Sequence, residues 1–196
     1  MPAVKDTRAL RPVQTRTILG IDPGTNLLGY GVVSVDGTGV HFADMGVLDL
    51  RKEADPYAKL GRIYELVKDL IEQWQPCAVA CESPFYGKNA QVILKLGRAQ
   101  GAAITAAAHK GVPVFEYAPR EAKMAIVGNG AASKEQVNIM VQKTLKTELD
   151  PKHLDATDAL AIALCHHFST SGPLAFAKGA KSWEKFIKEH PERVKK

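Results

Sequence analysis

The sequence predicts an α/β fold with a mixed five-stranded sheet, three antiparallel strands followed by two parallel ones, and helices on both faces. Three apolar runs within residues 18–50 are separated by turn residues, which is typical of an antiparallel meander. After residue 55, helical periodicity alternates with short apolar runs, as in a sheet covered by helices. A chain of 196 residues with 45% apolar and 24% charged residues suits one such domain with tails.

The first strand is predicted over residues 18–22. Ile18, Leu19 and Ile21 form an apolar run that stops at Asp22, which Pro-Gly follows. Asp22 is therefore expected at the carboxyl end of a buried strand, where open α/β sheets bind ligands. The alternative is that Asp22 only caps the turn with its side chain.

The next elements continue this sheet. Strands are expected over residues 29–35 and 40–50, joined by a tight Asp-Gly turn at 36–37. Asp55 followed by Pro predicts a helix start, and Pro76 stops this helix. The apolar run 77–82 ends in Glu82, and a right-handed crossover would place it parallel to the first strand. Asp22 and Glu82 would then lie at the same edge of the sheet.

The second half keeps the same alternation of helix and strand. The expected elements are a helix over 89–110, a strand over 112–117, a short helix from 119, a helix from 133 and a last helix over 155–168. The helix from 133 opens with Ser-Lys-Glu-Gln, which is a capping-box pattern.

The helix over 89–110 is apolar on more than one side. One stripe comprises Val92, Leu96, Ala99, Ala103 and Ala106, and a second comprises Ile93, Gly97, Ile104 and Ala108. A surface helix needs a single stripe against its own sheet. We therefore expect a second copy of the chain to cover the other stripe in a two-fold homodimer. The alternative is that the chain's own last helix covers it.

Charge and composition indicate which binding partners and which cellular compartment the chain suits. The net charge of +5 and the isoelectric point of about 9.1 favour a polyanionic partner such as nucleic acid. Much of the excess lies in residues 178–196, and such a tail is more often simply solvated. There is no apolar run of about 18 residues, so no membrane span is expected. The three cysteines have no metal-like pairing, which favours a reducing, cytoplasmic compartment.

The predicted domain organisation has three parts. Residues 1–16 form a polar lead that we expect to be disordered. Residues 17–168 form the folded domain, and residues 169–196 form a basic C-terminal tail.

Four acids at the ends of apolar segments predict a metal centre. Asp155 and Asp158 are three residues apart, so they share one face of a helix, although acids in a first helical turn often serve as caps. Clustered with Asp22 and Glu82, they would repel one another unless cations intervened. Carboxylate oxygens suit Mg²⁺ or Mn²⁺, and two such ions about 4 Å apart promote phosphodiester hydrolysis.

Short motifs in a fixed order carry a family resemblance. They are Gly-Ile-Asp-Pro-Gly-Thr at 20–25, Gly-Tyr-Gly at 29–31, Glu82, Phe85, Lys-Asn-Ala at 88–90, Leu-Lys-Leu-Gly at 94–97, Pro-Val-Phe-Glu-Tyr at 113–117, Val-Gly at 127–128 and Asp-Ala-Thr-Asp-Ala-Leu-Ala-Ile-Ala at 155–163. With these motifs the chain resembles the RuvC family of bacterial Holliday junction resolvases, within the ribonuclease H-like superfamily. The resemblance covers residues 17–168.

The resemblance implies a ribonuclease H-like fold and a crossover junction endodeoxyribonuclease that resolves Holliday junctions by paired, symmetric nicks. It assigns Asp22, Glu82, Asp155 and Asp158 as catalytic acids that bind two Mg²⁺ ions per subunit, with Mn²⁺ as an alternative. It also implies a homodimer, four-way junction DNA as substrate, and the branch-migration proteins RuvA and RuvB as partners.

The resemblance also indicates DNA contacts. Phe85 follows Glu82 in a loop, where its ring would stack on a base or wedge into a step, although it could instead fill a core gap. Lys123 and Lys134 match phosphate-contacting positions, and Lys88 and Lys95 are weaker candidates. His153 precedes the acids and could reach the site.

The sequence also leaves open a metal role for two histidines and two other functions for the chain. His166 and His167 invite a metal interpretation, but a favourable interaction with the helix dipole is the simpler account. A non-catalytic nucleic-acid-binding protein on the same fold is a competing function, because a fold does not fix an activity. The Gly-Ile-Asp-x-Gly-Thr run also resembles the first phosphate loop of actin-like nucleotide-binding proteins, but the chain is too short for the two domains that these need.

Overall fold

The structure is a computed structural model that describes residues 15–84, 89–149 and 154–171. Its sheet has the strand order β3-β2-β1-β4-β5. The strands are β1 (Arg16–Asp22), β2 (Leu27–Asp36), β3 (Gly39–Asp49), β4 (Ala78–Glu82) and β5 (Val114–Tyr117). The strand β2 pairs antiparallel with both β1 and β3, and β4 pairs in parallel with both β1 and β5. The predicted mixed sheet is confirmed.

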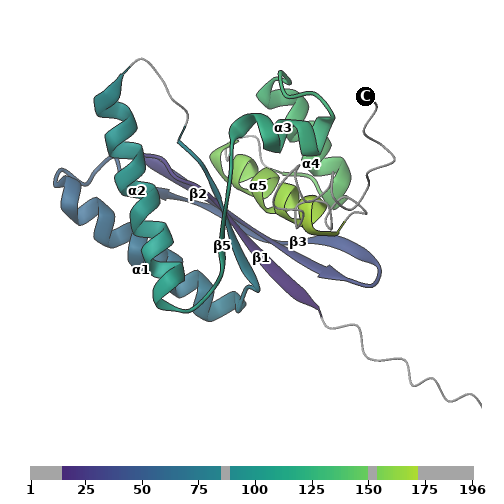
Figure 1. The fold of residues 1–196 in the computed structure, drawn as a ribbon, viewed down its shortest axis with the longest axis horizontal. Coiled ribbons are helices and arrows are strands. Elements are labelled where there is room, and N and C mark those ends of the chain that lie inside the picture. Colours follow the sequence, from purple (N-terminus) through teal and green to yellow (C-terminus); the bar gives the residue numbers. More distant parts are fainter. Residues whose placement is uncertain (1–14, 85–88, 150–153, 172–196) are drawn as a thin grey trace, which may run out of the picture.

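Helices cover both faces of this sheet (Figure 1). The helices α1 (Pro56–Trp74) and α2 (Ala90–His109) pack on one face, over a core that includes Leu19, Ile21 and Val79. On the other face lies α5 (Leu154–Ser171), with α3 (Pro119–Val127) and α4 (Lys134–Leu145) packed against it. Within the described ranges, no helix is both long and apolar enough to span a membrane.

The helix starts follow from the local sequence. The Asp55 carboxylate accepts hydrogen bonds from the amides of Tyr57 and Ala58 at 3.0 and 3.2 Å, so it caps α1 as predicted. Ser133 caps α4 in a capping box with Gln136. The last helix runs three residues beyond the predicted end at 168, and in this added turn Thr170 Oγ1 donates to the His166 carbonyl at 2.8 Å.

Two glycines let α5 lie directly on the sheet. A Cβ atom on Gly20 of β1 would fall 2.0 Å from the carbonyl oxygen of Ala159, and one on Gly29 of β2 would fall 2.0 Å from that of Asp155. Any side chain at these positions would therefore collide with the α5 backbone. The acids of α5 are held against the ends of β1 and β2 because these two positions carry no side chain.

The long helix α2 has one covered stripe. Ala99, Ala103 and Ala106 are buried against the sheet and α1, as the first predicted stripe requires, whereas Val92 is 47% exposed. The alternative in which the last helix covers the second stripe is wrong, since α5 packs on the opposite face of the sheet.

Candidate active site

Two acids meet where neighbouring parallel strands end. Asp22 closes β1 and Glu82 closes β4, and the pairing of Ile21 with Cys81 sets them side by side. Strand side chains alternate between faces, so Asp22 shares the α5 face with Gly20, and Glu82 shares it with Ala80. Both acids line the same hollow. The predicted meeting of these acids at one edge is confirmed, and Asp22 does more than cap its turn.

The first turns of α5 bring the other two acids to the same place. One carboxylate oxygen from each of Asp22, Asp155 and Asp158 lies within 4.8 Å of the others. Glu82 stands beside this triplet and lines a hollow of about 250 Å³ together with Asp22 and Asp158. Residues from two strands and one helix, more than 130 positions apart in the chain, thus converge on one point.

The clustering changes the proton affinity of the strand acids. Burial raises the pKa of Asp22 well above its usual value, and the neighbouring carboxylates of Glu82 and Asp158 raise it further. Burial likewise raises the pKa of Glu82, with a further contribution from Asp158. Without cations, these two acids therefore hold their protons to a higher pH than isolated carboxylates do.

Two lysines complete the hollow. Lys134 lies at the start of α4, and its Nζ donates to Asp158 Oδ2 at 2.5 Å. This contact raises the pKa of Lys134, so the ammonium stays charged. Lys123 lines the same hollow from α3. Both lysines that were predicted to contact phosphate thus lie beside the acids, and Asp158 has a cation as partner.

An apolar wall was missed from the sequence. The hollow is also lined by Pro119, Ala122, Val137, Ala161 and Ile162. Ala161 and Ile162 follow Asp158 by three and four positions, and this helical spacing was the available signal. Pro119 also lines a neighbouring hollow with Asp22 and Glu82, so these three residues border both hollows.

Other predicted residues fall outside the site or outside the described ranges. Phe85, Lys88 and His153 lie in segments that the structure does not describe. His166 is buried, and the Tyr117 hydroxyl lies 2.8 Å from its Nδ1. Burial lowers the pKa of His166 to about 4 and also lowers that of His167. Both rings are therefore neutral near pH 7, and the expected cation–dipole interaction at the helix end is wrong.

The donor set points to one kind of chemistry. Four carboxylates at one point are costly unless hard cations neutralise them, and oxygen-only sites suit Mg²⁺ or Mn²⁺. The adjacent lysines and the open hollow leave room for an anionic substrate next to the cations. Metal-assisted attack on a phosphate ester fits such an arrangement.

Comparison with known proteins gives a consistent result. Residues 18–166 match the family model described as "Crossover junction endodeoxyribonuclease RuvC". A relative of that name from Cytophaga hutchinsonii is 50% identical over 180 residues, which are 92% of this chain and 88% of the relative.

Solved structures agree with the sequence comparison. The structure of Thermus thermophilus RuvC superimposes with a TM-score of 0.71 at 37% identity, and covers 79% of this chain and 95% of that one. T. thermophilus RuvC in complex with Holliday junction substrate gives a TM-score of 0.71 at 34% identity, with coverage of 79% and 94%.

Proposed function

The chain belongs to the RuvC family of crossover junction endodeoxyribonucleases, and from this premise we propose that it resolves Holliday junctions in DNA by metal-dependent cleavage. The observation that carries the proposal is the convergence of Asp22, Glu82, Asp155 and Asp158 beside Lys123 and Lys134. The relative that was solved with a Holliday junction substrate supports the choice of DNA.

The acids fit two divalent ions. The oxygens of Asp22, Asp155 and Asp158 are close enough to share a cation, and Glu82 adds a donor beside Asp22. We assign all four as ligands of two Mg²⁺ ions per subunit, with Mn²⁺ as the alternative. Bound ions of this kind supply an activated water and neutralise charge on the leaving oxygen of a phosphodiester.

The protein's own groups bind and orient the substrate. Lys134 keeps two N–H donors beyond its bond to Asp158, and these are available to a phosphate oxygen. Lys123 adds a second positive charge from the α3 side of the hollow. The apolar wall around Pro119 gives the strand a surface without competing hydrogen-bond groups. Phe85 and Lys88 remain proposed DNA contacts on the loop after Glu82.

A homodimer follows from the substrate and from α2. A four-way junction presents two equivalent strands, and a two-fold pair of subunits presents two identical sites to them. The uncovered side of α2 is the surface that we assign to the interface. Family membership also leads us to expect RuvA and RuvB as partners. The free thiols of Cys77 and Cys81 agree with a cytoplasmic site of action.

A cleavage assay tests the function directly. The full chain is incubated with a labelled four-way junction and Mg²⁺, and the expected result is paired nicks in opposing strands. Asp22→Asn and Glu82→Gln should abolish nicking while binding of the junction persists in metal-free buffer. Asp69→Asn is the matched control, because Asp69 is an exposed acid of α1 on the opposite face of the sheet.

The same assay separates the competing functions. A wild-type protein that binds the junction but never cuts it would be a non-catalytic nucleic-acid-binding protein on this fold. Hydrolysis of ATP in a parallel incubation, without nicking, would favour the actin-like nucleotide-binding protein instead.

A further inference from the structure

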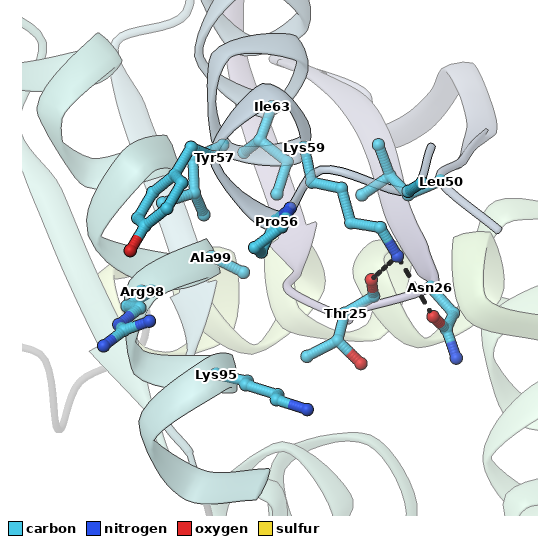
Figure 2. A pocket seen from close by; sticks show the side chains of 12 residues that line it. Thr25, Asn26, Leu50, Pro56, Tyr57, Lys59, Ile63, Lys95, Arg98 and Ala99 are labelled. Atoms are coloured by element: carbon cyan, nitrogen blue, oxygen red, sulfur yellow. Dashed lines mark hydrogen bonds between the residues drawn. The ribbon is translucent and has the colours of Figure 1, made fainter. Parts of the chain in front are cut away.

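A second hollow lies between α1, α2 and the turn after β1. Its volume is about 470 Å³, and it is larger than the hollow that holds the acids. Figure 2 shows its lining side chains, which belong to residues 25, 26, 50, 54, 56, 57, 59, 60, 63, 95, 98 and 99. We call it the α1–α2 groove.

The groove has an apolar floor and a basic rim. Leu50, Ile63 and Ala99 are buried beneath it. Its rim carries Lys59, Lys95 and Arg98, and no acid is present among the described residues that line it. An apolar base surrounded by three cations suits a ligand that joins an apolar ring to a phosphate.

Tyr57 supplies an aromatic surface at the same rim. Tyr57 is 70% exposed on the first turn of α1, so its ring is accessible to a ligand. Exposed aromatic rings next to cations are the usual platform on which unpaired bases stack. A pocket of this size holds a single nucleotide.

Lys59 holds one wall of the groove in place. Its Nζ donates to the Thr25 carbonyl at 3.3 Å and to Asn26 Oδ1 at 3.4 Å. An ammonium has three donors, so one remains for a ligand. Lys95 reaches from α2 across the opening toward Thr25 (Figure 2). The two lysines thus face the groove from opposite helices.

The α1–α2 groove is lined by neighbours in sequence of residues that line a hollow at the acids. Thr25 and Asn26 directly follow Asp22, Pro23 and Gly24, which line a hollow at the acids. On the other side, Leu96 of α2 lines that hollow while the preceding Lys95 lines the groove. The 22–26 segment and the 95–96 step of α2 therefore link the acids to the groove.

We propose that the α1–α2 groove binds an unpaired nucleotide of the cleaved strand close to the scissile phosphate. Its base stacks on Tyr57 and its phosphate contacts Lys95 and Arg98. This inference rests on the proposed function, because it takes the junction strand as its occupant. It assigns the groove a role in separating the bases next to the cut.

Binding of the full chain to a four-way junction in metal-free buffer tests the proposal. The probe carries 2-aminopurine at successive positions beside the cut site, so that stacking on an aromatic ring quenches its fluorescence. Tyr57→Ala should weaken binding by about 5- to 100-fold and abolish the quenching at one position. Tyr57→Phe keeps the ring and should behave as wild type. Both are surface changes and leave the fold intact.

The cations are tested in the same format. Replacing Lys95 and Arg98 together by Ala should flatten the slope of log affinity against log salt by about two units. The matched control is Lys143→Ala with Lys146→Ala, which removes two exposed charges at the far end of α4. An unchanged quenching profile in Tyr57→Ala would overturn the proposal that the groove binds a nucleotide. An equal change of the salt slope in both double variants would overturn it as well. Normal nicking by these variants then leaves the proposed function standing, whereas a wild type that never nicks refutes that function.

Discussion

Gly29 of β2 lies directly beneath Asp155 of α5, so closely that a Cβ atom on Gly29 would fall 2.0 Å from the Asp155 carbonyl oxygen. Gly29 is also the residue paired with Asp22 across the β1–β2 ladder. One position without a side chain therefore sets the separation of a strand acid from a helix acid. Because α5 carries Asp158 as well, its height above the sheet fixes the geometry of the site.

We expect Gly29→Ala to push α5 away from the sheet. The added methyl meets backbone atoms that cannot rotate away, so the free energy of unfolding should fall by about 3 kcal/mol, at the upper end of overpacking costs. Mg²⁺-dependent nicking should fall with it, since Asp155 moves. Urea unfolding and the cleavage assay measure the two effects.

Gly61→Ala is the matched control for that substitution. Gly61 lies inside α1, and a Cβ there meets nothing within 4 Å. This change should stabilise the fold by about 0.5–1 kcal/mol, because alanine favours a helix. If Gly29→Ala were as stable and active as wild type, the close contact would not govern the site.

The protonated acids predict an unusual dependence of stability on pH in metal-free buffer. The folded pKa values of Asp22 and Glu82 are raised, so the folded state keeps protons that the unfolded chain releases. The free energy of unfolding should therefore fall as the pH rises from about 4, the ordinary carboxyl value, through the raised pKa values. Asp22→Asn should flatten this profile and be more stable than wild type at neutral pH.

Added Mg²⁺ should reverse that order. Ions that bind only the folded wild type stabilise it by mass action, whereas Asp22→Asn has lost a ligand and should respond weakly. Urea titrations from pH 4 to 8, with chelator and then with Mg²⁺, give both profiles, and Asp69→Asn serves as the remote control. A wild type that gained stability with rising pH in chelator, and ignored Mg²⁺, would contradict the metal assignment.

The two lysines of the site predict the salt dependence of DNA binding. Lys123→Ala and Lys134→Ala should each weaken junction binding and reduce the slope of log affinity against log salt by about one unit. The reason is that each lost phosphate contact releases one counterion fewer. Fluorescence anisotropy in metal-free buffer measures the slope, and Lys143→Ala should leave it unchanged. Equal slopes in all variants would mean that neither lysine contacts a phosphate.

The sequence was a sufficient guide to the sheet and to the acids. Apolar runs that stop at Asp22 and Glu82, and the spacing of Asp155 and Asp158, are local features, and the parallel crossover brings them together. Other contacts between distant parts of the chain could not be predicted from the sequence. Nothing in a single sequence says that Gly20 and Gly29 touch a helix more than a hundred residues away. The contact between His166 and Tyr117, which lies 49 positions earlier, is likewise a tertiary feature.

The α2 surface shows the same division between local and tertiary information. The sequence predicted that α2 is apolar on more than one side, but it did not show which residues face the sheet and which face outward. The outward positions are Leu94, Gly97, Gly101, Ile104 and Ala108. Their spacing alternates between three and four residues, as in the seam of paired helices. Leu94 is 63% exposed, and a Cβ on Gly97 or Gly101 would meet nothing within 4 Å, so the described residues leave this seam open.

The seam predicts that Gly101→Glu separates the dimer without unfolding the subunit. Glutamate favours a helix more than glycine does, so the subunit should keep its stability, while its charge cannot be buried against a second copy of α2. Ala103 would be a poor site for the same test, because it is 1% exposed and faces the chain's own core. Gly61→Glu on α1 is the matched control for an added charge. Sedimentation at micromolar concentration should give a dimer for wild type and Gly61→Glu, and a monomer for Gly101→Glu.

The monomer should nick one strand of a junction at a time, because two coordinated cuts need two sites held in fixed relation. A Gly101→Glu protein that remained dimeric, or a monomer that still made paired cuts, would mean that another surface joins the subunits or that pairing of the cuts arises within one subunit.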